Sequence, residues 1–200
     1  MPTLPLQHRV ELVTAPVRQP INISECKEQM RIEHSDDDII INRFIDTATR
    51  YVDVTGALGK AMITQTWGEW IAPNPSVVYL SLGPVQSVTA IKYYDTDNVL
   101  QTDPLSNYHV LGTSGRMLVS PKTGFNWPTT FNRDDAIKIE YLIGYGDAPT
   151  DIPETIRHAL FMLVAHYYEN REPELIGTAS KTLPYGFEDL IGVERASYYG

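Results

Sequence analysis

Two kinds of hydrophobic pattern alternate along the chain. Near the start and again near the end, apolar residues recur every three or four positions, which indicates amphipathic helices. Between about residues 60 and 144, apolar and polar residues alternate or form short apolar runs, which indicates strands. The pattern predicts an α+β fold: a small helical bundle of three main helices, an inserted antiparallel β lobe, and an extended C-terminal tail.

Capping signals mark the starts of the first two helices. Asn22 and Glu25 have the spacing of a capping box, which predicts a helix over 23–32. Ser35 is a hydroxyl cap followed by three carboxylates at the positive end of the helix dipole. A second helix over 35–55 is therefore expected to begin there.

A third helix is predicted over 151–170. Asp151 and Glu154 repeat the capping-box spacing at its start. The helix that follows is apolar on nearly every side, so it must be covered all round by its own fold or by a neighbouring subunit.

The β lobe is built from short segments separated by turn residues. The segment 95–98 (DTDN) has the composition of a hairpin turn. Strands are expected over 63–67, 77–82, 85–94, 99–100, 108–111, 116–119 and 136–143. The expected organisation is an N-terminal arm over 1–21, a helical bundle over 22–59 and 145–173, a β lobe over 60–144 and a C-terminal docking tail over 174–200.

The last 27 residues combine helix-breaking positions with large apolar side chains. Gly177, Pro184, Gly186 and Gly192 make a long helix improbable. The apolar side chains would be costly to expose in water, so we expect them to order on another protein. These candidate docking residues are Leu183, Tyr185, Phe187, Leu190, Ile191, Tyr198 and Tyr199.

Composition narrows the class of protein. The chain has 25 acidic and 16 basic residues and a formal net charge of −9, which argues against a general nucleic-acid binder. Cys26 is the single cysteine, so no intramolecular disulfide is expected. The start lacks the pattern of a signal peptide, and no window reaches the roughly 18 to 20 apolar residues of a membrane span. We therefore expect a soluble protein made in the cytoplasm.

No residue pattern predicts catalysis, a metal site or a cofactor. His158 and His166 stand eight apart, about 12 Å along a helix, which is too far to chelate one ion. The helix dipole already accounts for the acids at 36–38. The glycines at 144–146 lack the third glycine of a dinucleotide loop, and Ser114 is outside a nucleophile elbow.

Four aromatic residues are candidates for a subunit interface. Trp67 and Trp70 stand three apart, so in a strand they face opposite sides of the sheet. Phe125 and Trp127 belong to a loop over 121–133. Nucleic-acid stacking would need a basic groove beside these rings, and none is visible, so a contact between subunits is favoured.

Several short sequence stretches, taken in the order in which they follow one another along the chain, resemble those of a known family. They are Cys26–Ile32 (CKEQMRI) before Asp36–Asp38, Ala48–Val52 before Thr55–Gly56, Thr64–Trp67, Leu82–Val88, Gly144–Asp147 with Pro153–Ile156, Leu163–Arg171, and Leu183–Gly186. In this order they resemble the phage head–tail connector (adaptor) family, over most of residues 22–192. The N-terminal arm and the Phe125–Phe131 loop have no counterpart in that resemblance.

The resemblance implies a structural protein of the neck of a virion or phage-like particle. Members form a ring, usually dodecameric, that matches the portal above and meets a tail-side neck protein below, while DNA passes without sequence-specific binding. On this reading the C-terminal tail docks on the portal. The acids expected to face the channel, where they would repel DNA, are Asp36, Asp37, Asp38 and Asp46.

Two other classes of function compete with this interpretation. A carbohydrate- or ligand-binding β module with helical flanks could use the aromatic loop at 121–133. A hydrolase is disfavoured because no acid/base constellation is visible in the sequence.

Overall fold

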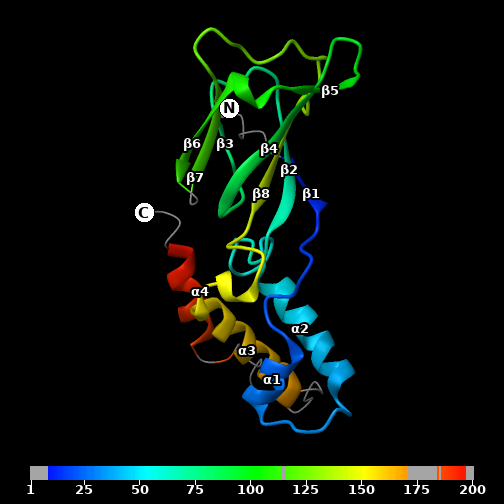
Figure 1. Ribbon diagram of the computed structural model, residues 1–200, viewed down its shortest axis with the longest axis vertical. Coiled ribbons are helices and arrows are strands. Elements are labelled where there is room, and N and C mark those ends of the chain that lie inside the picture. The colour runs from blue at the N-terminus through cyan, green and yellow to red at the C-terminus, as the bar shows by residue number, and fades with distance from the viewer. Residues whose placement is uncertain (1–8, 114–115, 171–183, 185, 197–200) are drawn as a thin grey trace, which may run out of the picture. The chain divides into compact units, whose positions relative to one another are not determined.

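The computed structural model describes residues 9–113, 116–170, 184 and 186–196 (Figure 1). The chain divides into two compact units: a β unit of residues up to 16 with 64–144, and a helical unit of residues 17–63 with 145–200. The described residues contain four α-helices rather than the three main helices expected, and the strands are antiparallel. The fold is thus α+β.

The helical unit is organised around one helix. Its described helices are α1 (Ile23–Met30), α2 (Asp38–Val52), α3 (Glu154–Glu169) and α4 (Phe187–Ala196). The other three all pack against α3, which explains why that helix is apolar on nearly every side. The other helices of the same unit therefore cover the apolar side chains of α3, as one of the two expected arrangements required.

The capping box predicted for α1 is confirmed. The Asn22 side chain accepts from the Glu25 backbone N–H at 3.0 Å, and the Glu25 carboxylate accepts from the Asn22 backbone N–H at 3.0 Å. Ile21 and Cys26, on either side of the cap, are both fully buried, as a hydrophobic staple requires. Burial raises the pKa of the Cys26 thiol to about 12.

Both later helix starts differ from the prediction by about three residues. α2 begins at Asp38, because residues 35–37 form a turn in which the Ser35 carbonyl accepts from the Asp38 backbone N–H. α3 begins at Glu154, because Asp151 caps a preceding 3₁₀ turn, η2 (Pro149–Asp151), by accepting from the Ala148 backbone N–H at 2.9 Å. At α3 the expected capping acid, Asp151, therefore caps a turn that precedes the helix.

The segment predicted as an extended tail contains α4. Phe187 and Ile191 are fully buried in the core of the helical unit, and Leu190 packs against that core. At the other end of α4, the Thr155 hydroxyl donates to the Glu194 carboxylate at 2.5 Å, and Lys60 donates to the Glu194 carbonyl. For residues 187–196, the expectation of a tail that leaves its own subunit is wrong.

The β unit consists of two antiparallel sheets. The larger sheet has the order β1-β2-β8-β4-β5, and the smaller has the order β3-β7-β6. Their strands are β1 (Arg9–Thr14), β2 (Gln65–Ile71), β3 (Val78–Tyr79), β4 (Val85–Tyr94), β5 (Leu100–Asp103), β6 (Tyr108–Thr113), β7 (Arg116–Pro121) and β8 (Ile137–Ile143); a 3₁₀ turn, η1 (Leu105–Asn107), precedes β6. Residues 9–14, part of the predicted arm, pair with β2 and form one edge of the large sheet.

Strand β8 lies at the centre of the large sheet, with β2 on one side and β4 on the other. Alternate residues of β8 point to opposite faces. Ile137, Ile139, Tyr141 and Ile143 are fully buried on one face. There the Tyr141 hydroxyl donates at 2.8 Å to Glu69, whose carboxylate also accepts from the Ser81 backbone N–H at 3.0 Å.

The packing of α4 can be tested by truncating its buried anchor. Phe187→Ala should lower the free energy of unfolding by about 3 to 5 kcal/mol, because it leaves a cavity against α3. Urea unfolding of the full chain, followed by circular dichroism, measures the change. Val193→Ala is the control on the same helix, since Val193 is exposed, and should change stability little. Equal stability of Phe187→Ala and wild type would contradict the packing of α4.

Candidate functional site

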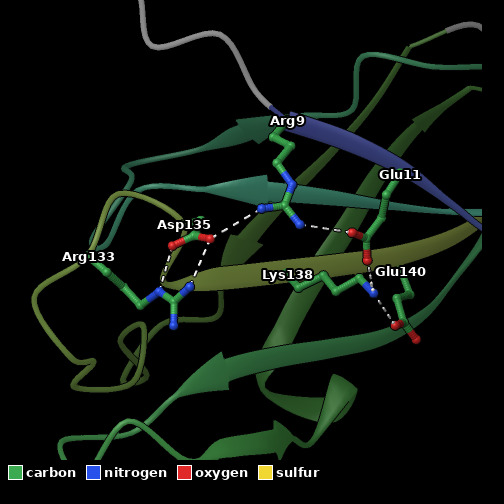
Figure 2. A network of polar contacts seen from close by, with 6 residues as sticks. All are labelled: Arg9, Glu11, Arg133, Asp135, Lys138 and Glu140. Atoms are coloured by element: carbon green, nitrogen blue, oxygen red, sulfur yellow. Dashed lines mark hydrogen bonds and ion pairs between the residues drawn. The ribbon is translucent and has the colours of Figure 1, made fainter.

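A network of charged side chains covers the face of the large sheet opposite its apolar core (Figure 2). Arg9 and Glu11 come from β1, and Lys138 and Glu140 come from β8. The strand register places Arg9 in line with Lys138 and Glu11 in line with Glu140, so the four residues share one face. Lys92, on β4, extends the network on the far side of β8.

Lys138 is the centre of this network. Its Nζ lies 2.6 Å from Glu11 Oε1 and 3.0 Å from Glu140 Oε1, so one ammonium bridges carboxylates on two strands. Glu140 also accepts from Lys92 Nζ at 2.8 Å. Lys138 and Glu140 are each only 8% exposed, so removing one partner would leave a buried charge uncompensated.

The network continues to the loop before β8, as Figure 2 shows. Arg9 lies 3.1 Å from Glu11 and 3.6 Å from Asp135. Arg133 holds Asp135 with two hydrogen bonds, of 2.5 and 2.9 Å. The Arg133 guanidinium also lies over the Tyr94 ring, 3.8 Å from its centre, where a cation–π interaction is favourable.

A glycine makes room for the bridging lysine. A Cβ on Gly68, in β2, would lie 2.3 Å from Lys138 Cε, much closer than real contacts allow. The Lys138 stem therefore crosses β2 over Gly68 to reach Glu11 on the edge strand. The network thus fastens β1, a strand distant in sequence, to the centre of the sheet.

The carboxylates of the network are held in their charged form. The hydrogen bond from Lys138 lowers the pKa of Glu11 to about 2 from its ordinary 4.5. Arg133 lowers the pKa of Asp135. Burial would raise the pKa of Glu140, but the hydrogen bonds from Lys92 and Lys138 outweigh it, and the pKa is lowered. Carboxylates that stay charged in this way suit ion pairs that link strands. They do not suit proton transfer at neutral pH, which needs a pKa nearer 7.

Three of the four aromatic residues predicted for a subunit interface are buried inside the β unit. Trp67 and Trp70 face opposite sides of the sheet, as predicted, but both are covered. Trp70 stacks on Tyr94, with ring centres 5.8 Å apart, and Trp127 packs on Tyr108 at 4.9 Å. The interface prediction is wrong for these three tryptophans, because all three are buried within the unit and residues distant in sequence, Tyr94 and Tyr108, lie against two of them.

Phe125 is the remaining member of that set, and it is exposed. In the same loop, Trp127 is buried beside Tyr108, whereas Phe131 is exposed like Phe125.

The four acids predicted to face a channel fall into two groups. Asp37 accepts from the Tyr168 hydroxyl at 2.6 Å, and Asp38 pairs with Lys27 at 2.9 Å, so both stabilise the helical unit. Asp36 and Asp46 are exposed, and the Asp46 carboxylate accepts from the Gln19 side chain at 2.7 Å. The structure therefore does not bring the four acids together as one charged surface.

The predicted docking residues are also divided. Phe187, Leu190 and Ile191 belong to α4 and its core, as described above. Leu183, Tyr185, Tyr198 and Tyr199 lie outside the described residues.

Sequence reasoning missed the charged network. A usable signal was present, because Arg9-x-Glu11 and Lys138-x-Glu140 place opposite charges on one face of a strand. The pairing of β1 with β2, which brings Glu11 near Lys138, has no local signal in the sequence.

The described residues contain no group of three or more histidine, cysteine or acidic residues placed to hold a metal ion. Among these same residues, no helix combines the length and apolar character that a bilayer span needs.

The family model of the head completion protein matches residues 19–180. Curated proteins gave no match.

Solved structures share the fold over nearly the whole chain. A chain in "Neck of empty GTA particle computed with C6 symmetry" is 21% identical, with a TM-score of 0.74 and coverage of 94% of this chain and 95% of that one. One in "Virion of native gene transfer agent (GTA) particle" is 20% identical, with a TM-score of 0.69 and coverage of 93% and 94%. One in "Neck of native GTA particle computed with C12 symmetry" is 19% identical, with a TM-score of 0.67 and coverage of 94% of each. The family match confirms the resemblance inferred from the sequence.

The charged network should make stability depend on pH through Glu11. Its folded pKa, about 2, lies below its ordinary 4.5, so its stabilising effect is complete above pH 4.5 and is lost as pH falls toward 2. Glu11→Gln should therefore be less stable than wild type at pH 7, and the difference should shrink steadily below pH 4.5. Urea titrations at several pH values measure this difference.

The matched control is Asp134→Asn, an exposed acid beside the network, which should show no such convergence. A Glu11→Gln difference that stays constant from pH 7 to pH 3 would refute the role given to Lys138.

Proposed function

Because the chain belongs to the head completion protein family, we propose that it is a structural ring subunit joining the portal to the tail in the neck of a phage or phage-like particle. The observation that carries the proposal is the family match over residues 19–180. The fold supports it, since this chain and a chain of a gene transfer agent neck cover each other almost completely.

The proposed ring has twelve copies. The similar neck structures were computed with C6 and with C12 symmetry. A twelve-fold ring satisfies both, because it contains the six-fold rotation. Closed rotational symmetry is also the usual arrangement of identical subunits.

The proposed role is mechanical and needs no catalytic group. Ion pairs among Glu11, Lys138, Glu140 and Lys92 link β1, across β2, to β8 and β4, which stiffens the β unit against shear. In the helical unit, Arg157 of α3 joins α1 by pairing with Glu25 at 2.5 Å, and it also pairs within α3 with Glu154 at 2.9 Å. Such cross-links suit a subunit that must transmit load.

The acidic charge suits a conduit for DNA. Twelve copies with a net charge of −9 each carry on the order of a hundred negative charges. Asp36 and Asp46, the exposed members of the predicted set, are the acids we propose to face the channel. DNA would then pass without being trapped at the wall.

Portal and tail-side neck proteins are the proposed partners. Since α4 packs into its own unit, the proposed portal docking rests on Leu183, Tyr185, Tyr198 and Tyr199, outside the described residues.

Deleting the gene for this chain tests the proposed function. Particle-producing cells should then yield DNA-containing heads that lack tails, because the joint between portal and tail is missing. Electron microscopy of purified particles counts tailed and tailless heads. Supplying the wild-type chain in trans should restore tails. Tailed particles in normal numbers after the deletion would overturn the proposal.

A further inference from the structure

The small sheet presents a row of apolar side chains on its outer face. The strand register places Tyr79 of β3 opposite Leu118 of β7, and Leu118 opposite Leu111 of β6. Tyr79 is 50% exposed and Leu111 is 53% exposed, whereas Val78 and Val119, on the opposite face, are buried. We call Tyr79, Leu118 and Leu111 the apolar row.

A contiguous row of this kind marks a surface that another molecule covers. Single exposed apolar residues are common on proteins, but side chains directly opposite each other on neighbouring strands form one patch. The described side chains that share this face of β6 and β7 include no carboxylate. His109 and Lys122 lie toward the same end of these two strands, two residues from Leu111 and four residues from Leu118. The patch is therefore apolar with a basic flank.

The hairpin between β4 and β5 presents a second apolar surface of opposite flanking charge. Val99 is 52% exposed and Leu100 is 45% exposed. Asp97, also exposed, and Asp95 stand in the turn that precedes them. We call the segment 95–100 the acidic tip.

Hydrogen bonds fix the shape of the acidic tip. The Asp95 carboxylate accepts from the backbone N–H groups of Asp97 and Val99, each at 3.0 Å. Arg133, a member of the charged network, donates to the Asn98 side chain at 3.0 Å. A tip held in this way loses little conformational freedom when it binds.

The two surfaces come from different parts of the same unit. In Figure 1 the β4–β5 hairpin projects to the right of the β unit, and the strands of the small sheet lie to the left. A ring of identical subunits needs this arrangement, because each copy meets its two neighbours through two different surfaces.

We propose that the acidic tip of one copy packs on the apolar row of the next copy and so joins neighbouring subunits of the ring. This inference rests on the proposed function. Val99 and Leu100 would cover Tyr79, Leu118 and Leu111, while Asp97 would approach the basic flank. The partner is a second copy of this chain, since the two surfaces match in apolar character and in charge and repeat on every copy.

Cysteine cross-linking tests the contact. The native Cys26 is buried, so cysteines introduced at exposed positions can be targeted selectively with a short bismaleimide. Rings of the full chain, purified alone or as part of particles, would carry Val99→Cys, Leu111→Cys or both. The double variant should give a ladder of covalent oligomers on a denaturing gel. Each single variant should stay monomeric, and a mixture of the two single variants should stop at dimers.

The control pairs Leu111→Cys with Val193→Cys, an exposed position on α4, and should give no ladder. Leu111→Glu should in addition dissociate the ring in native mass spectrometry, while Val193→Glu should leave it intact. Intact rings without a ladder from the double variant, or dimers from Leu111→Cys alone, would overturn the contact and leave the proposed function standing. A wild-type chain that forms no ring, alone or in particles, would overturn the proposed function itself.

Discussion

The β unit depends on the position of strand β8 between β2 and β4. Its odd-numbered residues, such as Ile139 and Tyr141, form the core on one face. Its even-numbered residues, Lys138 and Glu140, form the charged network on the other. A slip of one residue would exchange the two faces and bury both charges in the core, so the register of the whole sheet is strongly specified.

Helix α3 has the corresponding role in the helical unit, because α1, α2 and α4 all pack against it. The chain enters the β unit first, crosses to the helical unit, and repeats this once. Each unit is therefore completed by a segment that is distant in sequence from the rest of it. In the β unit this segment is β1, which pairs with β2. In the helical unit it is α4, which buries Phe187 and Ile191 in the core. Strand β1 and helix α4 are thereby fixed to the rest of their units, which suits a structural joint.

Local chemistry was sufficient to predict much of this architecture. The capping box at Asn22 and Glu25 predicted α1, and alternation predicted β4 and β8 closely. The spacing of Phe187, Leu190 and Ile191 fits one face of a helix, but the neighbouring glycines argued against helix formation. The packing of α4 on α3 outweighs the intrinsic free-energy cost of placing glycine in a helix. Helix propensity, a local property of the sequence, does not reveal that packing.

The candidate site was predicted less well for the same reason. Trp70 and Trp127 were expected at an interface because their sequence neighbours give no sign of what covers them. Tyr94 and Tyr108, which lie against these rings, come from other strands. Partners that depend on strand pairing, including Glu11 with Lys138, become visible only once the fold is known.

The central claim is that the chain is a ring subunit of the neck. Electron cryomicroscopy of purified particles that contain the chain tests it most directly. The account predicts rotationally repeated density next to the portal that both the β unit and the helical unit fit, with one copy of the chain in each repeat. A neck whose repeated density fits neither unit, or the chain found elsewhere in the particle, would contradict the account.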